Sequence, residues 1–325
     1  MRRSLFMYGN LLLLCAASFA MSSVAADPIH RDLDQGRADD ALQVLDSVLA
    51  QNPSDARAHN LRCRVYYEEQ QWEKAIRDCD AAVKAEPSSS NDHLWLGRAY
   101  GQKAAHSSLV SAYKLARKVA AEFEQAVQLD PRNADALADL GEFYVSAPGV
   151  VGGGVSRAVA LVPQLESVSP VDALALEARI AESRKDDTAA EADLKAAIAQ
   201  SPDPAGNWMN LAAFYRRHHR IDDMIAAAHT GASLDRRHGS ALVDGASDLD
   251  EARREPETAI QWLQQYLDSR AQSEDAPVFA VRAQLASLLA HQGDAAGAEE
   301  QLAAAHALAS GYRLPSLGGA ASAGR

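Results

Sequence analysis

Large and small apolar residues recur along the chain in a pattern that repeats about every 34 residues. Each period opens with a stretch that carries a large apolar, a small and an aromatic residue at helical spacing, as at Leu96, Gly97 and Tyr100. A second helical stretch follows and ends before a proline such as Pro131, because proline cannot continue a helix. The pattern therefore predicts an all-α protein built from helix hairpins.

About seven to eight such hairpins fit end to end, which is the signature of a repeat protein. The third is longer than the others by about ten residues, and we expect the segment 104–118 to lengthen its helices. The fourth has about five extra residues in 147–154, where Pro148 and three glycines predict a turn. The predicted repeats are residues 27–55, 56–89, 90–133, 134–170, 171–204, 205–238, 239–276 and 277–310.

These positions resemble the signature of the tetratricopeptide repeat, which is Trp-x2-Leu-Gly-x2-Tyr followed by Ala-x3-Phe-x2-Ala. Trp208, Leu211, Ala212 and Tyr215 match the first part in register. The resemblance covers most of the chain and implies a right-handed α-solenoid of hairpins with a concave groove. Proteins of this family bind other proteins in that groove, so the resemblance implies a scaffold with no cofactor and no catalytic activity.

The N-terminal 26 residues have the composition of a signal peptide. Arg2 and Arg3 precede the apolar run from Leu11 to Ala20, and small residues follow up to Ala26. We expect a mature chain that starts at Asp27 and is periplasmic or secreted; an uncleaved anchor and a twin-arginine signal are the alternatives. The tail 311–325 is rich in Gly, Ala and Ser, and we expect it to be disordered.

Charge restricts the classes of partner. The chain has a formal net charge of −12, and removal of residues 1–26 takes away two arginines and no acid, which gives −14. Such a chain lacks the positive surface that nucleic-acid binding requires. No second apolar segment is long enough to span a membrane, so we expect no membrane span after signal cleavage. The expected partner is another protein or a peptide segment, and the sequence leaves the oligomeric state open.

The resemblance also suggests which residues line the groove. Arg64, Arg98 and Arg179 occupy the same first-helix position in three repeats, and a row of arginines would bind carboxylates of a partner. The alternative is that they are ordinary surface arginines. The full set of candidate groove residues is Asn60, Arg64, Tyr67, Asn91, Leu94, Arg98, Gln102 and Arg179.

Cys63 and Cys79 are predicted to form a disulfide. They are the only cysteines after residue 26, and they lie at equal distances from a turn centred near Gln71. Equal spacing places two residues side by side in an antiparallel hairpin, and exported cysteines usually pair. The alternative is two reduced, buried thiols.

The sequence offers little evidence for catalysis or metal binding. The glycine run Gly152–Gly154 lacks the lysine of a phosphate-binding loop, and we interpret it as a turn. His218 and His219 are adjacent in sequence, so they face different ways on a helix and predict no metal site. By contrast, Lys114, Arg117 and Lys118 share one face of a helix, and we expect them to form a basic contact edge.

The leading hypothesis is a periplasmic scaffold or adaptor that binds a partner segment in its groove. The rival hypothesis is an accessory component of a transport system, which presents a solute or a solute-binding protein. A solute-binding accessory requires a closed, mainly apolar pocket, whereas an adaptor requires only an open groove.

Overall fold

The computed structural model describes residues 28–316, and every regular element in that range is helical. The predicted signal peptide 1–26 and the end of the predicted tail, 317–325, lie outside the described residues. The helices are α1 (Pro28–Asp34), α2 (Ala38–Gln51), α3 (Ala56–Glu68), α4 (Trp72–Ala85), α5 (Ser90–Ala105), α6 (Leu109–Leu129), α7 (Ala134–Ser146), α8 (Val155–Glu166), α9 (Pro170–Ser183), α10 (Asp187–Gln200), α11 (Ala205–Arg217), α12 (Ile221–Leu234), α13 (Ser240–Glu251), α14 (Pro256–Asp268), α15 (Val278–His291) and α16 (Ala295–Leu308), with the short 3-10 helix η1 (Gly149–Val151).

Each predicted repeat contains one pair of consecutive helices that pack against each other, from α1 and α2 to α15 and α16. Small residues allow this close packing. Gly97 in α5 faces Phe123 in α6, and a Cβ atom at Gly97 would lie 2.5 Å from the Phe123 ring. Ala75 in α4 and Ala190 in α10 are fully buried at equivalent positions. The repeat pattern in the sequence is therefore a packing pattern, and it specifies an α-solenoid of hairpins.

Polar side chains cap the starts of five helices. Asp55, Ser89, Asn133, Ser169 and Asp186 each precede a helix and accept a hydrogen bond from the backbone N–H three residues later. Each such cap stabilises a helix start by about 1 kcal/mol.

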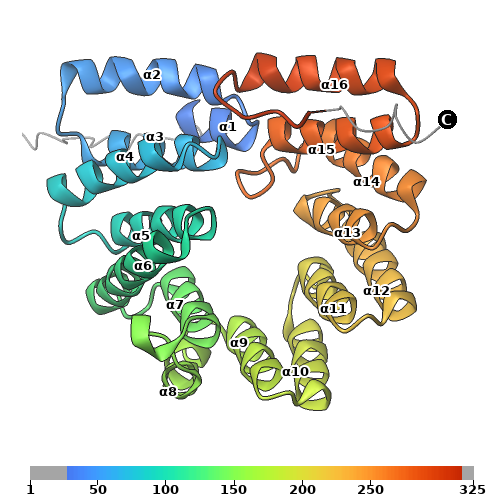
Figure 1. Ribbon diagram of the computed structural model, residues 1–325, viewed down its shortest axis with the longest axis horizontal. Coiled ribbons are helices and arrows are strands. Elements are labelled where there is room, and N and C mark those ends of the chain that lie inside the picture. The colour runs from blue at the N-terminus through green and yellow to red at the C-terminus, as the bar shows by residue number, and fades with distance from the viewer. Residues whose placement is uncertain (1–27, 317–325) are drawn as a thin grey trace, which may run out of the picture.

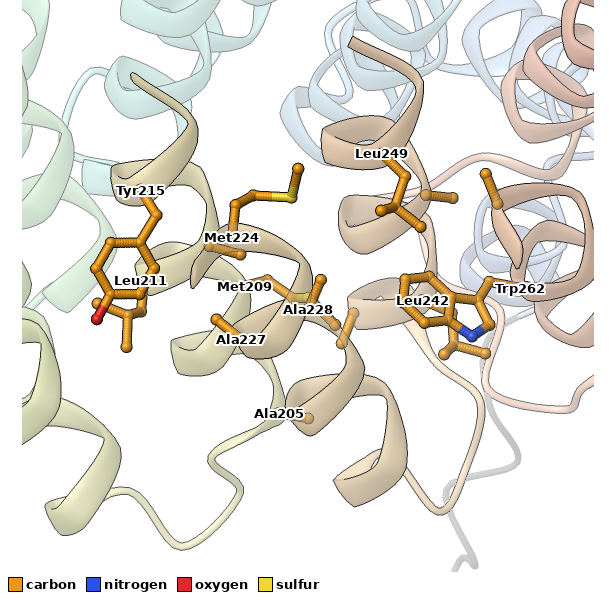
Figure 2. Close-up of a cluster of buried hydrophobic side chains, with 14 of the residues drawn as sticks. Ala205, Met209, Leu211, Tyr215, Met224, Ala227, Ala228, Leu242, Leu249 and Trp262 are labelled. Atoms are coloured by element: carbon orange, nitrogen blue, oxygen red, sulfur yellow. The ribbon is translucent and has the colours of Figure 1, made fainter. Parts of the chain in front are cut away.

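Neighbouring hairpins bury a continuous apolar interior between them. Figure 2 shows part of it in the sixth and seventh hairpins, where Met209 of α11 and Met224 of α12 face the side of α13 and α14 that carries Leu249 and Trp262. These four side chains are at most 7% exposed. Because every hairpin packs on the next one, this buried interface sets the orientation of each hairpin relative to its neighbour.

The solenoid closes into a ring. In Figure 1 the first hairpin lies beside the last, and α2 and α16 follow one another along the same edge. A shared cluster, here called the closure core, joins them. The closure core consists of Leu33, Ala38, Ala41, Leu45, Leu49, Ala58, Leu61, Val65, Phe279, Ala305 and Ala309. The sequence predicts a solenoid with a concave groove, and in the structure the two ends of that solenoid meet.

The segment after α16 reinforces the closure. The backbone N–H of Ser310 donates to Asp39 over 3.0 Å, and Gln71 Nε2 donates to the carbonyl oxygen of Gly311 over 3.0 Å. The ring of Tyr312 lies 4.9 Å from that of Phe279. We expected the tail to be disordered from residue 311, but its first residues lie against α2, α4 and the closure core, where Tyr312 finds an apolar surface.

The two lengthened repeats differ in how they use their extra residues. In the third, α5 has 16 residues and α6 has 21, so the insertion extends helices as predicted. In the fourth, the connection between α7 and α8 forms η1 and a glycine turn. Within residues 28–316 no helix is both long enough and apolar enough to cross a membrane.

Candidate functional site

The first helices of the hairpins lie on the inner side of the ring (Figure 1). Polar side chains connect neighbouring first helices. Arg98 Nε in α5 donates to Asp139 in α7 over 2.6 Å, and Arg216 Nε in α11 donates to Asp248 in α13 over 2.7 Å. Gln284 in α15 donates to the Ser247 hydroxyl in α13 over 3.0 Å. This surface, made by α3, α5, α7, α9, α11, α13 and α15, is called the inner face below.

Arg64 and Arg98, two of the predicted groove residues, share one aromatic ring. Each guanidinium lies over Trp95, with its central carbon 4.9 Å from the ring centroid. Arg64 also forms a two-bond ion pair with Glu274, in which Nε donates to Oε1 over 2.6 Å. Glu274 belongs to the loop before α15, so this pair crosses the closure of the ring.

The predicted arginine row is present on the inner face, and carboxylates of the protein itself occupy it. Arg179 in α9 donates to both carboxylate oxygens of Glu142 in α7, over 3.0 and 2.9 Å, and pairs with Glu182 over 2.7 Å. Arg98, which is bonded to Asp139, also forms a 3.9 Å ion pair with Asp135. A partner's carboxylate would have to displace these groups, so the arginines are poorly suited to the role the sequence suggested for them.

Tyr67 and Gln102, two other candidates, form a small polar contact beside Trp95. Gln102 Nε2 donates to the Tyr67 hydroxyl over 3.2 Å. The Tyr67 ring packs edge-on against Trp72 and Trp95, with centroids 5.6 and 5.5 Å away. These residues hold the second and third hairpins together and are only partly accessible.

The other three candidates separate by exposure. Asn91 is exposed at the start of α5. Asn60 is 4% exposed and donates to the buried carboxylate of Asp92 over 2.7 Å, and Leu94 is 1% exposed within the core. Asn60 and Leu94 therefore do not line a groove. Both residues pack in the contact between neighbouring hairpins instead.

Carboxylates that the sequence analysis missed dominate the inner face. Together with the arginines they form a charge belt, in which neighbouring members interact from the second hairpin to the seventh. The charge belt contains Glu68, Asp135, Asp139, Glu142, Glu182, Asp244, Asp248, Glu251, Glu274 and Asp275 with Arg64, Arg98, Arg179, Arg216 and Arg217. Carboxylates outnumber arginines in it, so the charge belt carries net negative charge.

The excess of carboxylates is greatest near the closure of the ring, where two carboxyl groups have raised pKa values. Burial, Glu274 and Asp275 raise the pKa of Glu68 to about 8. Partial desolvation, Asp248 and Asp275 raise the pKa of Asp244 to about 6, although Asp244 faces solvent. Burial and neighbouring carboxylates thus disfavour the charged form of both groups, and a cation placed beside them would favour it.

The sequence does contain a signal for this belt. Asp135, Asp139 and Glu142 lie at spacings of four and three residues in α7, and Asp244, Asp248 and Glu251 repeat that spacing in α13. Such spacing puts three carboxylates on one helix face. The sequence therefore predicts a row of carboxylates on these two helices, although the resemblance assigns only arginines among the charged residues to the groove.

Two cavities bear on the choice between adaptor and solute carrier. One of about 220 Å³ lies on the inner face between α7 and α9 and is lined by Asp139, Glu142 and Arg179 among others. A larger one, of about 630 Å³, lies between α8, α9 and α10, and its walls combine Val159 and Ile180 with charged groups. Both are open to solvent and bordered by charged side chains, so neither is the closed, mainly apolar pocket expected for a solute.

A disulfide joins Cys63 in α3 to Cys79 in α4, with Cα atoms 5.3 Å apart. Both cysteines are fully buried beside Leu96 and Ala75. The bond fixes the second hairpin, which carries Arg64 and Glu68 at the closure of the ring.

The remaining candidates have structural surroundings. His218 lies between Glu182 and Asp187, at 3.1 and 3.2 Å, and ends α11. Gly153 belongs to a turn in which any side chain would collide with the carbonyl oxygen of Ala147. Among residues 28–316 no group of three or more His, Cys, Asp or Glu side chains is arranged to hold a metal ion.

Comparison with known proteins identifies the repeat. The family model described as tetratricopeptide repeat matches residues 32–100, which confirms the resemblance in that stretch. A thermophilic tetratricopeptide-repeat protein of Thermus thermophilus is 18% identical with a TM-score of 0.48, covering 57% of this chain and 98% of its own. A tetratricopeptide-repeat protein of Parabacteroides merdae is 12% identical with a TM-score of 0.48, covering 78% of this chain and 95% of its own. No curated protein matches the sequence.

Proposed function

We propose that this chain, whose residues 32–100 carry tetratricopeptide repeats, is a non-catalytic scaffold that binds a segment of another protein on the inner face of its ring. Repeat scaffolds bind partners on an extended concave surface made by successive hairpins. Here that surface is the inner face, and its charge belt runs through every hairpin from the second to the seventh. The belt is the single observation that carries the proposal.

The bound segment is expected to carry lysine or arginine. The sequence suggested a partner rich in carboxylates, but Arg64, Arg98 and Arg179 are already paired. Glu68, Asp244 and Asp275, beside the closure, form no ion pair with any residue that the structure describes. Electrostatic complementarity therefore favours a cationic segment, and it would also speed the association of the two proteins.

Export to the periplasm or outside the cell remains part of the proposal. The disulfide between Cys63 and Cys79 supports it, because disulfides persist mainly in oxidising compartments. The transport alternative has less support, since the cavities at the inner face and beside α10 are lined by charged residues.

The experiment that tests this function is site-specific photo-crosslinking in an envelope extract. A photo-reactive residue replaces Ala175, which lines the inner-face cavity, or Lys195, which is exposed on α10. We expect position 175, and not position 195, to capture a defined protein, whose attached peptide is identified by mass spectrometry. Equal capture from both positions would contradict binding on the inner face.

The captured segment, made as a peptide, then tests the charge argument. The double variant Asp244→Asn/Asp275→Asn removes two unpaired carboxylates and should weaken binding roughly tenfold at low salt. The matched control is Asp222→Asn/Asp223→Asn on the exposed start of α12, which should leave affinity unchanged. Equal affinity of wild type and the Asp244/Asp275 variant would exclude a cationic segment at this place.

A further inference from the structure

Exposed aliphatic side chains are concentrated at one place in the described part of the chain. Leu109 is 89% exposed, Val150 72% and Val110 71%, whereas the large apolar residues exposed at other sites reach only 41%. Tyr113, 45% exposed, joins the two segments, because its hydroxyl donates to the carbonyl oxygen of Val150 over 3.3 Å. Leu109, Val110, Tyr113 and Val150 are called the apolar tip below.

The apolar tip is built by the two segments that exceed the regular repeat length. Leu109 and Val110 start the lengthened helix α6, and Val150 lies in η1, within the lengthened connection of the next hairpin. Both segments connect the two helices of a hairpin, so they lie at the same edge of the ring. Gly152 lets η1 approach α6, since a Cβ atom there would lie 3.1 Å from that of Ala120. The fold thus places both of its irregular segments in one exposed protrusion.

Charge around the apolar tip is the reverse of charge elsewhere. The chain has a net charge of −12, yet residues 93–121 and 143–165 contain no Asp or Glu. Lys114 and Arg117 are exposed about one and two turns after Leu109 and Val110, and neither forms an ion pair within residues 28–316. Lys118 lies on the same side, over the ring of Tyr100. The basic edge predicted from the sequence is therefore exposed, and it borders an apolar surface.

We propose that the apolar tip and its basic border bind the surface of a membrane that contains anionic lipids. A few aliphatic side chains that insert among headgroups, flanked by Lys and Arg that contact phosphates, are sufficient for reversible membrane binding. A stable protein interface needs about 800 Å² from each partner, which four side chains on a protrusion do not supply. The acidic remainder of the ring is repelled by the same lipids, so the tip alone faces the bilayer.

Vesicle flotation with the purified chain from Asp27 tests the proposal. We expect the protein to float with vesicles of phosphatidylcholine and phosphatidylglycerol, to stay behind with phosphatidylcholine alone, and to be released by high salt. Leu109→Ser/Val110→Ser/Val150→Ser should abolish flotation, and Lys114→Glu/Arg117→Glu should lower the partition coefficient roughly tenfold or more. Thermal melts followed by circular dichroism verify that each variant is folded. We expect folded variants because the replaced side chains are exposed.

Matched controls alter the same kinds of residue elsewhere. Val44→Ser/Leu234→Ser removes two other exposed aliphatic side chains, and Arg236→Glu/Arg270→Glu reverses two other exposed charges. Both should float like wild type. Failure of the wild type to float with phosphatidylglycerol vesicles, or equal flotation of wild type and the serine variant, overturns the proposal. The proposal is also overturned if an acidic protein binds the tip, if the same substitutions abolish that binding, and if no vesicle binds.

Discussion

Gly36, in the turn after α1, lies directly against the backbone of Val278 at the start of α15, where the first and last hairpins meet. Its φ is +62°, and a Cβ atom would lie 2.6 Å from the Val278 amide nitrogen. Gly36→Ala should therefore lower the free energy of unfolding by roughly 2–4 kcal/mol, through backbone strain and collision together.

Gly293→Ala is the matched control, measured in the same urea titrations. Gly293 has a φ of +85°, and a Cβ atom built there would have no atom within 4 Å. Alanine at this position would therefore be strained in its backbone, as at Gly36, but would not collide with a neighbour. We expect a loss of only about 1 kcal/mol there. Equal losses for the two variants would mean that the contact at Val278 contributes nothing to stability.

The ion pair of Arg64 with Glu274 should stabilise the closed ring. The two side chains are 18% and 12% exposed, and removal of Arg64 leaves Glu274 beside Glu68 and Asp275. Arg64→Ala should cost about 1–3 kcal/mol, because an unpaired carboxylate remains partly buried. It should also increase the radius of gyration measured by small-angle X-ray scattering.

Arg237→Ala provides the comparison for an exposed pair. Arg237 and Asp203 form a 2.8 Å ion pair with side chains 76% and 61% exposed. Its loss should change stability by less than about 0.5 kcal/mol and leave the radius of gyration unchanged. If Arg64→Ala behaves in the same way, the ring does not depend on its ion pair.

Stability should fall as pH rises, and Glu69 is one cause. Glu69 is 1% exposed, and burial together with nearby Asp39 raises its pKa to about 7. A carboxyl whose pKa is higher in the folded than in the unfolded state binds more protons when folded. Its contribution is complete below the unfolded pKa near 4.5 and is lost as pH rises through 7.

We expect the free energy of unfolding of the wild type to decrease between about pH 5 and pH 8, with roughly 1–3 kcal/mol of that decrease due to Glu69. Glu69→Gln should reduce the slope, because the amide keeps an acceptor for the Gly311 N–H and does not titrate. Glu68 and Asp244, whose pKa values are also raised, contribute to the remaining slope. Identical slopes for wild type and variant would refute the role of Glu69.

Reduction should destabilise the second hairpin. The disulfide closes a loop across a sequence separation of 16 residues, for which the expected contribution is about 3 kcal/mol. The unfolded, non-reduced chain from Asp27, which lacks Cys15, should show no free thiols by Ellman titration. Dithiothreitol should lower the melting temperature of the wild type and leave that of Cys63→Ala/Cys79→Ala unchanged; two free thiols before reduction would show that the bond is absent.

The sequence predicts the hairpins well because their determinants are local. Gly97 and Phe123 belong to one repeat, so their spacing predicts their contact. The closure involves Arg64 and Glu274, 210 residues apart, and results from small rotations summed over all the hairpins. No spacing within a repeat encodes that sum. For the same reason the sequence indicates the arginine row on the inner face, but not the carboxylates of other hairpins that pair with it, such as Glu142 with Arg179 and Glu274 with Arg64.

The contact between the first and last hairpins limits how the chain can change its length. In an open array each repeat touches only its neighbours, so a whole repeat can be gained or lost with the others undisturbed. In this protein the loss of an interior hairpin would separate Gly36 from Val278 and expose the closure core. Residues can be inserted without opening the ring in the turns between the two helices of a hairpin, because these turns point away from the contacts between hairpins. Those turns are where the third and fourth hairpins carry their additional residues.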